Sequence, residues 1–183
     1  MVAIDGKVLR RWFDRASGKS ALHMVSAWGC EQRMVLAQIA TEAKSNEITA
    51  VPKLLDMLSL KATIVTTDAL NCQREIARKI VEKGGDYALA LKGNQGTLHD
   101  DLRQFLDDPK CGASVGKPTV DVDHGRSETR TAMTSSDINW LQENHQWPGL
   151  TAIGKWSASG KRSRRPRPRR RIICSVHRCP ANG

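Results

Sequence analysis

The sequence lacks the features that would assign it to a membrane or secreted class. It has no run of about 18 apolar residues, the length that a membrane-spanning helix requires. Its first residues lack the charged segment and following apolar segment of a secretory signal peptide. The five cysteines are scattered and odd in number, which favours free thiols over a disulfide framework. These absences predict a cytoplasmic protein that makes no membrane contact.

Acidic residues are missing from the last part of the chain. Residues 157–183 contain nine Lys or Arg and no Asp or Glu, so residues 1–156 are nearly neutral although the whole chain carries +10. The Arg/Pro-rich segment cannot bury apolar surface and is expected to be a disordered tail that binds polyanions without sequence specificity. We therefore predict a folded core over residues 1–156 and a basic tail over 157–183. The abrupt change in composition suggests a shifted reading frame in the tail.

The core shows the pattern of an α/β fold. Apolar segments separated by tight turns predict an antiparallel three-strand meander over 2–13, 21–28 and 33–43. Further strands are expected at 62–68 and 86–92, and apolar residues at helical spacing predict helices at 49–60, 72–85, 97–109 and 137–150. Residues 111–119 are expected to form a loop, and 124–136 an extended segment. Meander and βαβ units together predict a mixed sheet with flanking helices.

Two aspartates stand on predicted strands. Asp68 ends the strand at 62–68, where either Asp68 or Asn71 can cap the next helix by accepting a backbone N–H. A carboxylate at the end of a rigid strand is also a well-positioned metal ligand. Asp5 lies on the first strand, which can lie beside the fourth. Two adjacent carboxylates repel unless they share a cation or a proton, so the pair predicts a metal site or a proton-sharing dyad.

Several segments resemble insertion-sequence transposases of the H-repeat-associated type. The resemblance covers residues 2–156 and lies in "IDGKVLR", "RASGKSALHMVSAW", "TEAKSNEITAVPKLL", "TIVTTDALNCQ", "GGDYALALKGNQ" and "HGRSETR". It implies a ribonuclease H-like core, incomplete here at both ends, with an Asp-Asp-Glu triad at Asp5, Asp68 and Glu128. Glu42 and Glu47 are alternatives for the glutamate, but they precede the second aspartate and break the expected order.

The resemblance also implies a chemistry and a partner. Two Mg²⁺ ions roughly 3.5–4 Å apart would support DNA cleavage by water and strand joining by a 3′-hydroxyl. Asp5 would bridge both ions, and Asp68 and Glu128 would each favour one. The implied partners are the transposon ends and the target DNA, with oligomers possible during transposition. Candidate phosphate contacts are Lys92, Asn94, His124, Arg126 and Arg130.

Two functional hypotheses remain open. The chain is either a DNA transposase, expected to be a degenerate remnant, or an inert fragment that binds nucleic acid through its basic tail. Two other motifs are rejected. The "SGKS" at 17–20 has Phe13 where a phosphate loop needs glycine, and Cys174, His177 and Cys179 give only three potential zinc ligands at odd spacing.

Overall fold

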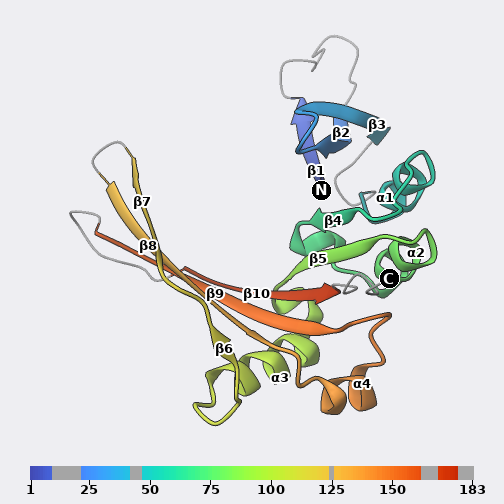
Figure 1. The fold of residues 1–183 in the computed structure, drawn as a ribbon. Helices are drawn as coiled ribbons and strands as arrows, with labels where there is room; N and C mark the ends of the chain where they lie inside the picture. Colours follow the sequence, from blue (N-terminus) through green and yellow to red (C-terminus); the bar gives the residue numbers. More distant parts are fainter. Residues whose placement is uncertain (10–21, 42–46, 124–125, 162–168, 177–183) are drawn as a thin grey trace, which may run out of the picture. The chain divides into compact units, whose positions relative to one another are not determined.

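The computed structural model describes residues 1–9, 22–41, 47–123, 126–161 and 169–176. The chain forms two compact units, Met1–Leu89 and Ala90–Gly183 (Figure 1). In the described residues, no helix is long and apolar enough to cross a membrane.

The first unit is built on a mixed sheet. Its opening strands β1, β2 and β3 form an antiparallel meander, in which Asp5 lies opposite Ser26 and Ser26 opposite Gln38. Strand β4 then pairs in parallel with β1, and β5 pairs in parallel with β4. The strand order is therefore β3-β2-β1-β4-β5. The strand bounds are β1 Val2–Leu9, β2 Leu22–Gly29, β3 Met34–Thr41, β4 Ile64–Thr67 and β5 Asp86–Leu91.

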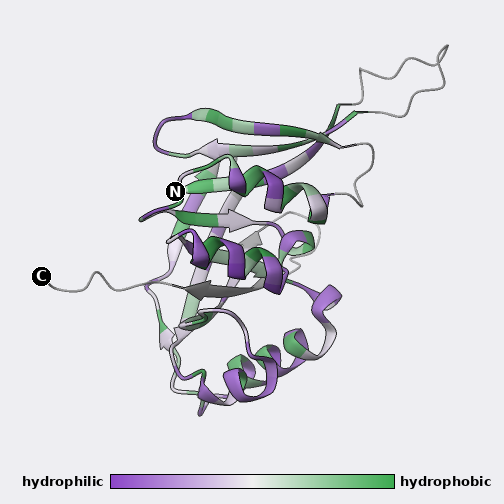
Figure 2. Cartoon of the chain, turned by 90° about the vertical axis from the view of Figure 1, so that its right-hand side faces the viewer, coloured by the Kyte–Doolittle hydropathy of each residue, from purple (hydrophilic) through white to green (hydrophobic). Residues whose placement is uncertain are grey.

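Two α-helices connect the parallel strands of this unit. Helix α1 spans Glu47–Asp56 and helix α2 spans Arg74–Glu82, with the 3-10 helix η3 (Ala69–Asn71) just before α2. Both α-helices bury an apolar stripe, and Figure 2 shows hydrophobic and hydrophilic residues alternating along the helical ribbons. The core therefore consists of these stripes and of buried strand residues. They include Val2, Ile4, Val25, Ala27, Val51, Leu54, Leu55, Val65, Ile76, Ile80, Tyr87 and Leu89.

The second unit combines two helices with a sheet of long antiparallel strands. Strand β9 pairs with both β10 and β8, and β8 also pairs with β6 and β7. Lys155 of β9 fixes helix α3, because its Nζ donates to the carbonyl oxygen of Leu106 at 3.0 Å. His145 of α4 bonds to Asp101 of α3 at 2.7 Å. The bounds are η4 Gly93–Gln95, α3 Gly96–Asp107, β6 Ser114–Val115, β7 Thr119–Asp123, β8 Arg126–Ser135, α4 Asn139–His145, β9 Ala152–Lys161 and β10 Arg169–Val176.

The mixed α/β sheet predicted from the sequence is confirmed, and two expectations need correction. The expected loop at 111–119 contains β6 and the start of β7, because both segments pair with β8. Parts of the tail expected to be disordered are also strands. Strand β9 continues to Lys161, and β10 pairs with it in a register that places Ile172 opposite Lys155. Backbone pairing and the β-branched pair Ile172 and Ile173 favour a strand there despite the surrounding arginines.

Candidate functional site

Asp5 lies on β1, and Asp68 directly follows the end of the neighbouring parallel strand β4. The pairing of β1 with β4 ends at Ile4 opposite Thr67, and the two aspartates are the next residues along. Ile4 and Thr67 are both buried, whereas Asp5 and Asp68 are both exposed, so the two strands alternate in phase. Adjacent strands are separated by about 4.8 Å. The register thus places the backbones of Asp5 and Asp68 at neighbouring positions of the sheet.

Asp68 also has a structural role. Its backbone is still extended, with φ −73° and ψ 176°, and its side chain accepts a hydrogen bond from the backbone N–H of Asn71. The prediction that Asp68 acts as a cap is therefore confirmed, although it caps the 3-10 helix η3 and not α2. The capping bond at 3.4 Å joins Oδ1, so the cap and an exposed carboxylate coexist in one side chain.

Three buried polar side chains lie behind Asp68. Nε2 of His23 on β2 bonds to Oε1 of Glu47, the first residue of α1. The side-chain amide of Asn71 donates to Glu47 Oε2 at 3.5 Å and to Asp68 Oδ1 at 3.1 Å. His23, Glu47 and Asn71 are each at most 2% exposed. Sequence reasoning considered Glu47 only as a metal ligand and missed His23, whose signal was a polar residue inside an apolar strand.

Glu128 lies in the second unit, on β8, where its partner is an arginine. Oε1 of Glu128 accepts a hydrogen bond from Nε of Arg130 at 2.8 Å, and Nη1 of Arg130 also pairs with Asp121 of β7 at 2.8 Å. The hydrogen bond that Arg130 donates to Glu128, with the charges of Glu128 and Asp121, raises the pKa of the Arg130 guanidinium above its usual value. Arg130 also lies 6.0 Å from the centre of the Trp156 ring. Glu128 and Arg130 thus engage each other on the strand surface.

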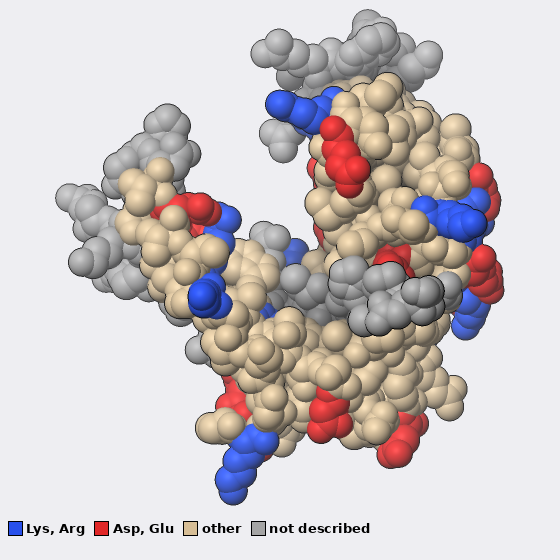
Figure 3. Space-filling view, viewed as in Figure 1, with Lys and Arg blue, Asp and Glu red and all other residues tan. Residues whose placement is uncertain are grey.

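The remaining candidates for phosphate contacts differ in where they lie and in how much of each the structure describes. Lys92 and Asn94 are exposed around η4, which directly follows β5. His124 lies outside the described residues, and so does the side chain of Arg126, whose backbone begins β8. On the visible face of the β7–β8 hairpin, acidic and basic atoms lie next to one another (Figure 3). The charges seen there do not form a uniformly basic surface.

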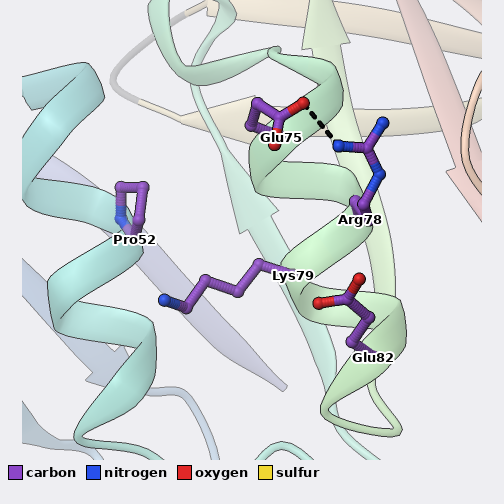
Figure 4. A pocket seen from close by; sticks show the side chains of 5 residues that line it. All are labelled: Pro52, Glu75, Arg78, Lys79 and Glu82. Carbon is purple, nitrogen blue, oxygen red and sulfur yellow. Dashed lines mark hydrogen bonds and ion pairs between the residues drawn. The ribbon is translucent and has the colours of Figure 1, made fainter.

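A shallow cleft between α1 and α2 has a charged lining. It has a volume of about 340 Å³ and is lined by Pro52, Glu75, Arg78, Lys79 and Glu82. Figure 4 shows Arg78 paired with Glu75, and Lys79 extending toward α1, where its Nζ lies 2.6 Å from Asp56. These ion pairs engage Glu75, Arg78 and Lys79. The pair of Lys79 with Asp56 thus connects α2 to α1 at this cleft.

A serine within a Gly-x-Ser-x-Gly sequence, residues 112–116, is not a catalytic nucleophile elbow. That elbow requires a sharp turn between a strand and a helix. Ser114 instead lies inside β6 and faces Thr134 in the antiparallel register with β8. This arrangement gives no support to serine hydrolase chemistry.

The donor atoms of Asp5 and Asp68 suit a hard divalent cation. Mg²⁺ prefers carboxylate oxygens and keeps several waters, so two carboxylates and water can hold it. Among the described residues, no cluster of three or more His, Cys, Asp or Glu side chains is arranged to hold a metal. The pair therefore fits part of a magnesium site, and the third ligand predicted at Glu128 stays a prediction.

Comparisons with known proteins agree with these features. A protein of Xanthobacter autotrophicus, named only as uncharacterized, is 45% identical over 153 residues, which are 83% of this chain and 52% of that protein. YncI of Escherichia coli O157:H7, named as a candidate transposase, is 44% identical over 156 residues, covering 84% of this chain and 40% of that protein. YbfD of Escherichia coli K12, named as an H repeat-associated candidate transposase, is 44% identical over 135 residues, with coverages of 71% and 52%.

The chain spans about half the length of the curated relatives that it matches. The match to a solved piggyBac transposase synaptic complex with hairpin DNA covers 70% of this chain and 30% of that one, at 9% identity and a TM-score of 0.43. The family model described as transposase DDE domain matches residues 1–168. The chain therefore belongs to the transposase DDE domain family, and its mixed sheet is the ribonuclease H-like fold that the sequence motifs led us to expect.

Proposed function

We propose that this chain carries the metal-binding part of a DNA transposase, in which Asp5 and Asp68 hold Mg²⁺ for cleavage and transfer of DNA strands. The observation that supports this function best is the neighbouring position of the two exposed aspartates, one on β1 and one directly after the parallel strand β4. Two carboxylates at this spacing repel each other, and a divalent cation between them removes that cost.

The two aspartates contribute to the site in different ways. Asp5 lies within β1, where it pairs with Ser26 of β2 one residue past the last pair of β1 with β4, so the sheet fixes its backbone position. Asp68 follows the end of β4 and is held by Asn71 through Oδ1. Bound Mg²⁺ would activate water or a 3′-hydroxyl and stabilise the leaving oxygen in an in-line displacement at phosphorus.

The DNA contacts belong to the same proposal. Lys92 and Asn94 are exposed and can reach phosphate oxygens without first leaving a buried position. Arg130 would have to leave Glu128 and Asp121 before it could bind phosphate, which makes it a weaker candidate than Lys92. Glu128 stays the predicted third carboxylate, and it too must leave its ion pair with Arg130 before it can bind a cation.

Metal binding without DNA tests this proposal directly. Mn²⁺, which replaces Mg²⁺ in oxygen-ligand sites, is titrated into the full chain and the free ion is followed by electron paramagnetic resonance. We expect saturable binding by the wild type and at least tenfold weaker binding by Asp5→Asn and by Asp68→Asn. Asp137→Asn, the same exchange at an exposed residue outside the pair, should bind like the wild type. Equal affinity of all four proteins would remove the proposed site.

A nicking assay on supercoiled plasmid in Mg²⁺ separates an active nuclease from a remnant. We expect no nicking by this chain, because Glu128, the predicted third carboxylate, is engaged in its ion pair with Arg130. Nicking by the wild type that is lost in Asp68→Ala would establish an active nuclease and overturn the expectation of a remnant.

The second candidate function is nucleic-acid binding by the basic segment without catalysis. The segment from 157 to 183 carries nine basic residues and no acidic ones. Such a segment binds phosphate chains electrostatically and with little sequence preference. Salt-sensitive DNA binding together with an absence of Mn²⁺ binding would favour this candidate over the first.

A further inference from the structure

The buried side chains of His23, Glu47 and Asn71 form a series of hydrogen bonds that ends at Asp68. The exposed carboxylate of Asp68 is the one that we propose as a metal ligand. Glu47 accepts from His23 through Oε1 and from Asn71 through Oε2. Asn71 then donates to Asp68 Oδ1 from both its backbone N–H and its side-chain amide. The chain of contacts thus connects β2, α1 and η3 with the end of β4.

The contacts fix the orientation of the Asn71 amide. A side-chain amide has one acceptor end and one donor end, and only the NH₂ end can face two carboxylates. Both Glu47 and Asp68 are carboxylates, so the NH₂ group must point toward them. The Asn71 Oδ1 atom is consequently left buried, and it has no hydrogen-bond partner within the described part of the chain. Leaving it so is costly, which indicates that the donor end is the functional one.

The absence of a side chain at Gly6 of β1 leaves room for the Glu47 carboxylate. Any side chain at Gly6 would place its Cβ inside the Glu47 carboxylate. Gly6 directly follows Asp5. Strand β1 therefore carries Asp5 and also accommodates the Glu47 carboxylate, which is connected to Asp68 through Asn71. A buried carboxylate loses its hydration, and an apolar side chain of similar size would avoid that cost. A role in orienting Asp68 explains why a charged group lies here.

We propose that Glu47 is a positioning residue, which acts through Asn71 to hold the Asp68 carboxylate in one orientation. This inference rests on the proposed role of Asp68 as a metal ligand. His23 supports Glu47 by donating from Nε2, and its Nδ1 has no partner among the described residues. Because both bonds from Asn71 reach Oδ1, the other oxygen of Asp68 receives no donor from Asn71 and is left for a cation.

The test compares Glu47→Gln with the matched exchange Glu75→Gln on the exposed face of α2. Glutamine has the shape of glutamate but carries an NH₂ group in place of one acceptor, so either the bond to His23 or the bond to Asn71 is lost. We expect Glu47→Gln to weaken Mn²⁺ binding about tenfold or more, and Glu75→Gln to leave it unchanged. In an Asp68→Asn background, Glu47→Gln should cause no further loss, because the ligand that it orients is already gone.

A purely structural role gives a different result. In that case Glu47→Gln lowers the melting temperature, the folded protein binds Mn²⁺ like the wild type, and the inference is overturned. If Glu47→Gln does not fold, Asn71→Ala decides, since it removes the amide and leaves the Glu47–His23 pair intact. Wild-type affinity in Asn71→Ala would likewise contradict the inference.

A measurement on the metal-free protein separates this inference from the proposed function. The side-chain amide of Asn71 gives its own proton–nitrogen signals in nuclear magnetic resonance. We expect these signals to shift, and their protons to exchange faster with water, in Glu47→Gln but not in Glu75→Gln. If the wild type binds no Mn²⁺, the proposed metal site fails while this result still decides whether Glu47 orients Asn71. Unchanged Asn71 signals in Glu47→Gln would refute the positioning role.

Discussion

Arg130 donates a hydrogen bond from Nε to Oε1 of Glu128, two residues away on the same strand, at 2.8 Å. Residues i and i+2 of a strand point to the same face, so this pair follows directly from the strand geometry of β8. The contact places a cation where a metal ion would otherwise be needed to balance Glu128. Any role for Glu128 as a metal ligand therefore involves competition between Arg130 and the metal.

This competition predicts opposite effects of two substitutions. As a third ligand, Glu128→Gln should weaken Mn²⁺ binding about tenfold, whereas Arg130→Ala should strengthen it by releasing the carboxylate. Both affinities can be measured by the same titration of free Mn²⁺. If Glu128→Gln binds Mn²⁺ like the wild type and differs only by a small change in melting temperature, Glu128 belongs to the ion pair alone.

The close approach of Glu47 to Gly6 predicts that adding a single methyl group at this position destabilises the fold. Gly6→Ala forces the new Cβ into the Glu47 carboxylate, and we expect the free energy of unfolding to fall by about 1–3 kcal/mol. The control is Gly93→Ala in η4, where an added Cβ meets nothing within 4 Å. Urea unfolding followed by circular dichroism measures both. If both variants unfold with the same free energy, the Glu47 carboxylate can move away from position 6 without destabilising the fold.

Cys72 predicts a thiol that resists modification. Burial raises the pKa of the Cys72 thiol to about 12, so almost no thiolate forms near pH 8. Cys30 and Cys111 are only half-buried. Iodoacetamide at pH 8, with mass mapping of the peptides, should label Cys30 and Cys111 well before Cys72. Labelling of Cys72 at the same rate in the folded protein would contradict its burial.

The same pKa shift predicts a loss of stability at alkaline pH. The folded value lies above the unfolded one, so the contribution of Cys72 is complete below about pH 9 and falls as the pH rises toward about 12. Above pH 9 the unfolded chain loses this proton while the folded chain keeps it. The free energy of unfolding should therefore decline more steeply with pH in the wild type than in Cys72→Ala. Parallel pH profiles would refute the shift.

The basic segment predicts a salt dependence of DNA binding. Replacing Arg162, Arg164, Arg165 and Arg167 by serine should weaken binding to any duplex and reduce the slope of log affinity against log salt by up to about 3.6, since each phosphate contact contributes about 0.9. Fluorescence anisotropy with two unrelated duplexes measures the slope. A loss of affinity for only one of the duplexes would point to sequence recognition and against simple charge attraction.

The sequence predicted the parts of the fold that depend on local pattern. Apolar segments and turn residues predicted the meander and the parallel strands, and the adjacency of the first and fourth strands followed from their order. The prediction of a loop at 111–119 was wrong. Ser114 and Thr119 lie in segments with little apolar pattern of their own, and these segments become strands because they pair with β8. The sequence also failed to predict that β10 is a strand, because its backbone pairing with β9 does not depend on hydrophobic periodicity.

The candidate site was predictable only where it lies on strands. Asp5 and Asp68 could be paired because strand order and register decide where they stand. The contacts of Glu47 with His23 and Asn71 join residues 24 positions away along the chain in each direction. Such contacts depend on how α1 packs on the sheet, which no short segment encodes. Glu47 therefore looked like a possible ligand in the sequence and is a buried residue in the fold.

The different anchoring of the two aspartates has a consequence for the way in which the site responds to a cation. Asp5 lies inside β1, which pairs with β2 along its whole length, so the amide protons of β1 should exchange with deuterium only when the sheet opens. Asp68 stands where β4 ends in a single 3-10 turn, and its side chain is held there by two hydrogen bonds from Asn71. Loading the site should therefore leave β1 unaltered and slow the fluctuations of Ala69–Asn71, so that the stiffening of one short turn reports occupancy.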